Sequence, residues 1–183
     1  VLPVGASSVS ASTIKTEPQK TEKTLPGTLG SLTMHKGTSV FTMIKRVYGD
    51  SDPECMNAVK AANPHLADIR QVQPGDAINI PAVPVGRNPL MSGQDKFLVK
   101  VYKAGDLKEA YNLIMDYPDN FPPVRIFSYW NVREGTVFLV IMSNGFKSED
   151  AAVQAVKLLP PAYAAHAGII KSWDNDNLYF AKR

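Results

Sequence analysis

The sequence predicts an α+β protein built from two small units. In several short runs apolar and polar residues alternate, which is the period of a half-buried strand, and between these runs apolar residues recur with the period of a helix. Residues 82–95, rich in Pro and Gly, separate two such groups of elements. With 183 residues and 44% hydrophobic content, the chain is long enough for two small domains.

The first unit is predicted to begin with a strand and a helix. Leu32 and Met34 alternate with polar neighbours until Gly37 ends the strand. A helix follows at once and stops at Gly49. Its predicted apolar stripe consists of Val40, Phe41, Ile44, Val47 and Tyr48.

A second helix and a closing strand complete this unit. Asp52 and Pro53 are typical of an N-cap and a first helical residue, and the helix is expected to end at Asn63-Pro64. Cys55 falls inside it and is interpreted as a small buried or half-buried hydrophobe. After a turn at Pro74-Gly75, alternating Ile78 and Ile80 predict the closing strand.

This strand–helix–helix–strand order, and its punctuation, resemble the lysin motif (LysM), a domain that binds glycans containing N-acetylglucosamine. The landmarks that coincide are Lys36-Gly37, Val47-Tyr48-Gly49, Ala62-Asn63-Pro64, and Gln73-Pro74-Gly75 leading to Ile78-Asn79-Ile80-Pro81. The family usually has Gly-Asp-Thr-Leu after its first strand, where this chain has Gly37-Thr38-Ser39-Val40. The helix cap then falls to Thr38 or Ser39, both of which can cap a helix.

The resemblance implies a glycan groove between two loops. Its residues would be Gly37, Thr38, Ser39 and Val40 on one side, and Asn63, Pro64, His65, Leu66, Ala67, Asp68 and Ile69 on the other. Backbone groups would bind the N-acetyl amide, and Leu66 and Ile69 would contact its methyl group. The alternative is that Leu66 and Ile69 only fill the small core.

The second unit is predicted to follow the order strand, helix, strand, strand, helix, strand. The strands are expected at residues 97–104, 124–132, 136–143 and 168–173. A helix begins in a capping-box-like sequence at Asp106, and another begins at Ser148. This is the split β-α-β (ferredoxin-like) pattern, in which two helices cover one face of an antiparallel sheet and the other face is open.

This half resembles the sporulation-related repeat (SPOR), another peptidoglycan-binding family. The resemblance rests on residues 97–101, on the helix centred on Ala110, and on residues 146–151. The family often has Gln in the first strand and Gly-Pro-Phe before the second helix, whereas this chain has Lys100 and Asn144-Gly145-Phe146.

Strand parity predicts which side chains occupy the open face. If Val99 and Val101 pack under the helices, Lys100 and Tyr102 point the other way. The residues expected to form a glycan- or partner-binding surface there are Lys100, Tyr102, Trp130, Phe138 and Trp173, with Tyr129 as an alternative to Trp130. The competing interpretation places both tryptophans in the core or between the two units.

The sequence gives no sign of catalysis or of a cofactor. His35, His65 and His166 lack metal-ligand spacing, and no nucleophile, acid–base or phosphate-binding motif is recognisable. We therefore expect no enzyme, no metal and no cofactor. A net charge of +3 is too small for a dedicated nucleic-acid binder, and no run of about 18 apolar residues predicts a membrane span. RNA binding on the second sheet is a weaker alternative because the usual aromatic signature is missing.

Together these observations predict four segments: a flexible Ser/Thr/Pro linker at 1–29, a LysM-like domain at 30–82, a linker at 83–95 and a SPOR-like domain at 96–183. The function expected from both resemblances is a non-catalytic peptidoglycan tether in the periplasm or cell envelope, with any signal or anchor upstream of Val1. The alternative is a protein-interaction segment of a secretion or envelope assembly machine whose glycan sites are degenerate.

Overall fold

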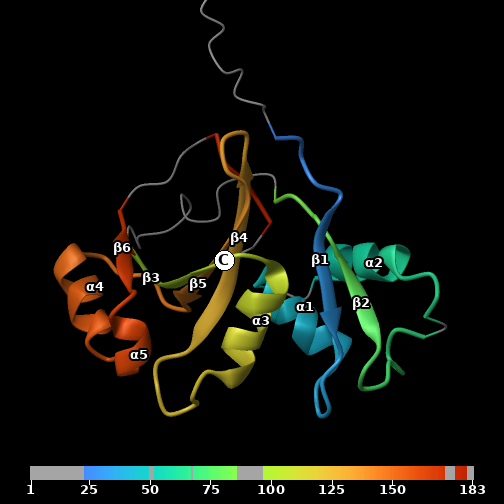
Figure 1. Cartoon of the computed structure of the whole chain (residues 1–183), viewed down its shortest axis with the longest axis horizontal. Coiled ribbons are helices and arrows are strands. Elements are labelled where there is room, and N and C mark those ends of the chain that lie inside the picture. Colours follow the sequence, from blue (N-terminus) through green and yellow to red (C-terminus); the bar gives the residue numbers. More distant parts are fainter. Residues whose placement is uncertain (1–22, 50–51, 67, 86–96, 172–175, 181–183) are drawn as a thin grey trace, which may run out of the picture.

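A computed structural model describes residues 23–49, 52–66, 68–85, 97–171 and 176–180 (Figure 1). These residues contain five helices and two antiparallel sheets, which confirms the α+β class. The elements are β1 (Thr28–Thr33), α1 (Val40–Tyr48), α2 (Pro53–Ala62), β2 (Ala77–Pro81), β3 (Leu98–Ala104), α3 (Leu107–Asp116), β4 (Val124–Asn131), β5 (Gly135–Met142), α4 (Glu149–Val156), α5 (Pro161–Ala164), β6 (Gly168–Ile170) and β7 (Leu178–Tyr179). Most of the predicted linkers, residues 1–29 and 83–95, lies outside the described residues.

The first unit, β1 to β2, has the predicted order, and its two strands pair antiparallel. Its first strand starts at Thr28, earlier than predicted, and Leu29 is already buried. The buried face of α1 consists of Val40, Met43, Ile44, Val47 and Tyr48. Phe41 was wrongly assigned to this stripe: its side chain is 53% exposed, because residue 41 falls outside the arc that these five positions share.

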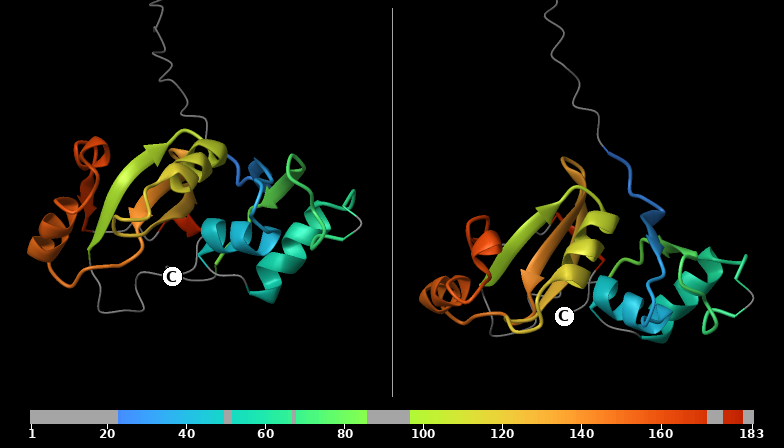
Figure 2. Two further views of the ribbon diagram at one scale, coloured as in Figure 1. Left: turned by 90° about the horizontal axis from the view of Figure 1, so that it is seen from below. Right: turned by 60° about the horizontal axis from the view of Figure 1, so that its bottom comes forward.

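The second unit, β3 to β7, is a five-stranded sheet in the order β6-β3-β5-β4-β7. Helices α3 and α4 pack on one face of this sheet, where Leu107 and Ala152 join Val99 and Val101 in the core (Figure 2). The last strand, β7, was not predicted from the sequence. It pairs with β4 through Tyr179 and Tyr129, and it is too short to leave a periodic signal.

The prediction of an open second face is wrong. That face carries its own buried cluster, which we call the second-face cluster: Leu98, Phe127, Val137, Leu139, Ile141 and Tyr179. Every one of these side chains is at most 5% exposed. Both faces of β5 are therefore apolar, which explains why its sequence is a continuous apolar run.

A bulge in β3 moves Tyr102 to the helix-covered face. The register of β3 against β5 shifts between Lys100, which pairs with Ile141, and Tyr102, which pairs with Val140. An extra residue in one strand inverts the parity of everything beyond it. Tyr102 therefore packs beside the helices, and its hydroxyl donates to Glu109 Oε1 at 2.9 Å.

Trp130 and Phe138 also lie on the helix-covered face, so the prediction that they join Lys100 on an open face is wrong. Phe138 is 5% exposed and stands opposite Ala104, and Trp130 is half-buried against the same core. In β4 and β5 the even-numbered residues face the helices and the odd-numbered ones form the second face. Trp130 instead packs against the core, as the alternative interpretation of the tryptophans expected.

The two units share one core. The buried cluster that contains Leu32 and Ile44 of the first unit continues into Tyr111 and Ile126 of the second; we call it the main core. Helix α3 packs against β1, and α1 packs against β4 (Figures 1 and 2). Gly30 lies at the contact of β1 with α3, where an added Cβ atom would lie 3.4 Å from Leu107 Cβ.

Candidate functional site

The first predicted loop, residues 37–40, is occupied by contacts that build the fold. Gly37 turns the chain with a φ of 80°, a conformation that favours glycine. The Thr38 hydroxyl donates to the His35 carbonyl at 2.7 Å, and Ser39 caps α1 by accepting from the Thr42 amide at 3.2 Å. Val40 is buried in the main core. The backbone turn and cap thus use the polar side chains of this loop.

In the second loop, Asn63 is a structural residue. Its side chain is 2% exposed and donates to the carbonyls of Val59 at 2.7 Å and Asn79 at 2.8 Å. Its Oδ1 accepts from the Asn79 amide, also at 2.8 Å. These three bonds join the end of α2 to β2, so this amide has no donor or acceptor directed toward solvent.

The remaining residues of the second loop divide into exposed and packed groups. Pro64 and His65 are exposed, whereas Leu66 and Ile69 are half-buried and pack against the main core. Asp68 forms an ion pair with Arg70, whose side-chain hydrogen bonds lower the pKa of this carboxyl group. Ala67 lies outside the described residues.

Tyr129, the alternative to Trp130, packs against the second-face cluster and so lies on the face opposite the helices. Of the other predicted residues that the structure describes, only Lys100 lies on that face. It stands opposite Ile141, a member of the second-face cluster, and its Cε is 3.4 Å from the position of a Cβ added to Gly168. Trp173 lies outside the described residues. The structure therefore does not bring the predicted aromatic platform together.

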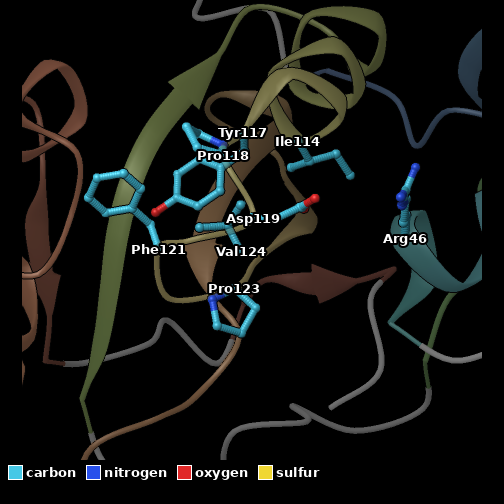
Figure 3. A pocket seen from close by; sticks show the side chains of 8 residues that line it. All are labelled: Arg46, Ile114, Tyr117, Pro118, Asp119, Phe121, Pro123 and Val124. Atoms are coloured by element: carbon cyan, nitrogen blue, oxygen red, sulfur yellow. The ribbon is translucent and has the colours of Figure 1, made fainter.

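A cleft that was not predicted lies at the junction of the two units. It has a volume of about 410 Å³ and is lined by Arg46, Ile114, Tyr117, Pro118, Asp119, Phe121, Pro123 and Val124. Figure 3 shows Arg46 on α1, across from side chains of the connection between α3 and β4. The sequence held one signal, because residues 117–123 combine two aromatic residues with three prolines, which is unusual for a solvated loop.

The cleft combines apolar side chains with two opposite charges. The Arg46 guanidinium contacts the Met115 sulfur, and it opposes the rise in the pKa of Tyr111 that burial causes. Tyr117 is 8% exposed, and its hydroxyl has no hydrogen-bond partner among the described residues. Burial, with Tyr163 nearby, raises the pKa of Tyr117, so the phenol keeps its proton at neutral pH.

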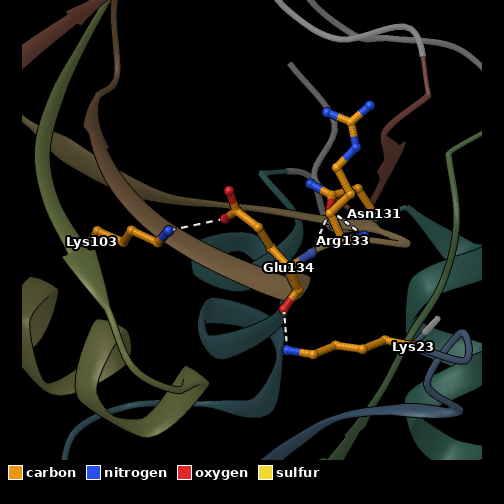
Figure 4. Close-up of polar contacts among 5 residues, drawn as sticks. All are labelled: Lys23, Lys103, Asn131, Arg133 and Glu134. Atoms are coloured by element: carbon orange, nitrogen blue, oxygen red, sulfur yellow. Dashed lines mark hydrogen bonds and ion pairs between the residues drawn. The ribbon is translucent and has the colours of Figure 1, made fainter. Parts of the chain in front are cut away.

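A second polar cluster holds the hairpin between β4 and β5 (Figure 4). Asn131 Oδ1 accepts from the amides of Arg133 at 3.0 Å and Glu134 at 2.7 Å, which fixes the turn. Lys23 donates to the Glu134 carbonyl at 2.6 Å, and Lys103 pairs with the Glu134 carboxylate at 3.0 Å. This ion pair is about half exposed and contributes little stability, so the cluster serves mainly to place the segment before β1.

Two absences apply to the residues that the structure describes. Among them, no group of three or more His, Cys, Asp or Glu side chains is arranged to hold a metal ion. No helix in the same residues is both long enough and apolar enough to cross a membrane. Cys55 is buried, which confirms its interpretation as a small buried hydrophobe.

Over part of its length the chain is similar to a known protein family. The family model described as Phage Tail Protein X matches residues 32–88, which is less than half of the chain. No curated protein and no solved structure matches the chain significantly.

This match corrects both resemblances drawn from the sequence. The lysin-motif and sporulation-repeat assignments are not supported. The expected function as a peptidoglycan tether is wrong, and so is the alternative of a secretion or envelope assembly segment with degenerate glycan sites. The physical reason lies in the landmarks themselves. Gly37, Ser39 and Asn63 serve a turn, a cap and a helix–strand link, so their spacing indicates a fold and not a ligand. In residues 32–88 the chain is similar to Phage Tail Protein X.

Proposed function

We propose that this chain is a structural component of a phage tail or of a related tail-like assembly, acting through protein contacts and without catalysis. The observation that carries this proposal is the match of residues 32–88 to Phage Tail Protein X. The non-enzymatic role rests on the sequence, in which no nucleophile or acid–base motif is recognisable.

The structure of the matched segment supports a rigid assembly block. Polar side chains in its two loops are used internally, as the three hydrogen bonds of Asn63 illustrate. Tyr48 links α1 to the end of β2 by donating to the Pro81 carbonyl at 2.6 Å. A block whose loops are fixed in this way loses little conformational entropy when it docks, which favours assembly by surface contacts.

The second unit would supply the other part of such a block. We propose that residues 97–170 are a split β-α-β domain, because β6, β3, β5 and β4 have the strand order and antiparallel pairing of that pattern. We likewise propose that the chain divides into two domains, at 30–82 and 96–183. Since the main core is continuous across both, we expect them to act as one body.

The proposal can be tested in cells that produce the phage or tail-like particles to which the chain would belong. The chain, carrying an N-terminal epitope tag, is expressed there, and the particles are separated on a density gradient. We expect the tagged chain to sediment with the particles at a constant ratio, and gold-labelled antibody to mark their tails in electron micrographs. An unrelated tagged protein of similar size is the control. A chain that stays with the control at the top of the gradient would contradict the proposal.

A further inference from the structure

The cleft between α1 and the α3–β4 connection contains two charged groups that form no ion pair among the residues that the structure describes. These groups are Arg46 and Asp119. The Met115 sulfur and the Tyr111 phenol, with which Arg46 interacts, are both uncharged, so neither neutralises the guanidinium group. A partly buried guanidinium without a carboxylate attracts an anionic ligand.

Apolar side chains lie between these charges. Ile114, Phe121 and Val124 are half-buried, so each still offers surface to a ligand. Pro118 and Pro123 are exposed, so the cleft can be reached from solvent.

We propose that this cleft binds an extended segment of a partner protein in which an acidic residue stands next to a bulky apolar residue. The carboxylate would pair with Arg46, and the apolar side chain would contact Ile114, Phe121 and Val124. Charge complementarity favours this occupant, because Arg46 has no ion-pair partner among the described residues and lies beside apolar side chains. The cleft volume of about 410 Å³ is near the lower end for ligand sites, which suits a pair of residues and not a folded domain.

Asp119 makes the proposal sharper. Its exposed carboxylate lines the same cleft, so it competes with the ligand carboxylate for the positive charge of Arg46. Removing this negative charge should therefore strengthen binding of an acidic ligand. A cleft that only packs two units together would not respond in this way. The inference does not depend on the tail assembly proposed above, because the cleft is defined by its own geometry.

The experiment uses the full chain and two capped dipeptides, acetyl-Glu-Phe-amide and acetyl-Gln-Phe-amide. They differ by one charge and are nearly equal in shape. Binding is followed by NMR from the amide shifts of Ile114, Tyr117, Phe121 and Val124. We expect saturable shifts with the Glu peptide at millimolar concentration, and about fivefold weaker binding of the Gln peptide. Absence of shifts at these amides, or equal affinity for the two peptides, would overturn the proposal.

Three variants separate the roles of the charges. Arg46→Met keeps the apolar stem and should abolish the preference for Glu over Gln. Arg70→Met is the matched control, because Arg70 pairs with Asp68 and does not line the cleft, and the preference should remain. Asp119→Asn should tighten binding of the Glu peptide about twofold to fivefold. Thermal unfolding checks that each variant is folded. A preference that survives in Arg46→Met would refute the proposal.

Discussion

Asn63 and Asn79 exchange two hydrogen bonds of 2.8 Å, one in each direction, between the side chain of Asn63 and the main chain of Asn79. The pair fixes the C-terminal end of α2 against β2, at the point where the helix would otherwise leave its last carbonyls unpaired. Asn63 is buried, so water does not replace its bonds. The loop that follows α2 therefore starts from a fixed position.

Replacing Asn63 should be costly for this reason. Asn63→Ala removes the partners of the Val59 carbonyl and of the Asn79 main chain, and we expect the free energy of unfolding in urea to fall by about 1–3 kcal/mol. Asn79→Ser is the control, because it keeps the main-chain groups that make both bonds and should change the free energy by less than about 0.5 kcal/mol. Equal effects of the two substitutions would show that the link is unimportant.

The contact of β1 with α3 predicts that the two units unfold together. Gly30 has a φ of 146° and lies against Leu107 of the second unit. Gly30→Ala should lower the free energy of unfolding by about 1–3 kcal/mol, because that φ strains any side chain. Gly27→Ala is the control, since no atom lies within 4 Å of the added Cβ. Tryptophan fluorescence, which reports the second unit, and far-ultraviolet circular dichroism should give one common midpoint for Gly30→Ala. Two midpoints would contradict the shared core.

Local features of the fold were predictable because local bonds determine them. Asp52 and Ser148 were predicted as N-caps, and each accepts a hydrogen bond from the main chain of its helix. Asp106 does the same at α3. The predicted sheet face of Tyr102 was wrong because β3 has a bulge there. A bulge depends on how two strands pair, and the alternation of residues within one strand carries no information on that pairing. The cleft was missed because Arg46 and Phe121 meet only through packing of distant segments.

The corrected position of Phe138 leads to a third prediction. Phe138 was expected on an exposed binding face, but it is 5% exposed beneath the helices. Phe138→Ala should therefore lower the free energy of unfolding by about 3–5 kcal/mol. Lys100→Ala, at the other predicted position, should change it by less than about 1 kcal/mol, since Lys100 is half-exposed and makes no ion pair among the described residues. Denaturant unfolding measures both. A small loss for Phe138→Ala would support the original exposed placement.

The last prediction concerns alkaline pH and Tyr48. Burial raises the pKa of the Tyr48 phenol well above its usual range, with the nearby Cys55 adding to the effect. In the unfolded chain the same phenol ionises near pH 10. Its stabilising contribution is therefore complete below about pH 10 and is lost as the pH rises toward the folded pKa, by at most about 1.4 kcal/mol per pH unit. At pH 8, Tyr48→Phe should cost about 1 kcal/mol, because it removes the hydrogen bond to the Pro81 carbonyl.

Above pH 10 the wild-type protein loses stability that the variant keeps, because phenylalanine does not ionise. The difference between the two proteins should therefore shrink between pH 8 and pH 11. Urea unfolding of both proteins at several pH values in this interval measures the difference directly. The other buried tyrosines, such as Tyr111 and Tyr129, whose pKa values are also raised mainly by burial, act equally in both proteins and cancel in the comparison. A difference that stays constant from pH 8 to pH 11 would mean that Tyr48 ionises at the same pH in the folded and unfolded chains, contrary to its burial between α1 and β2.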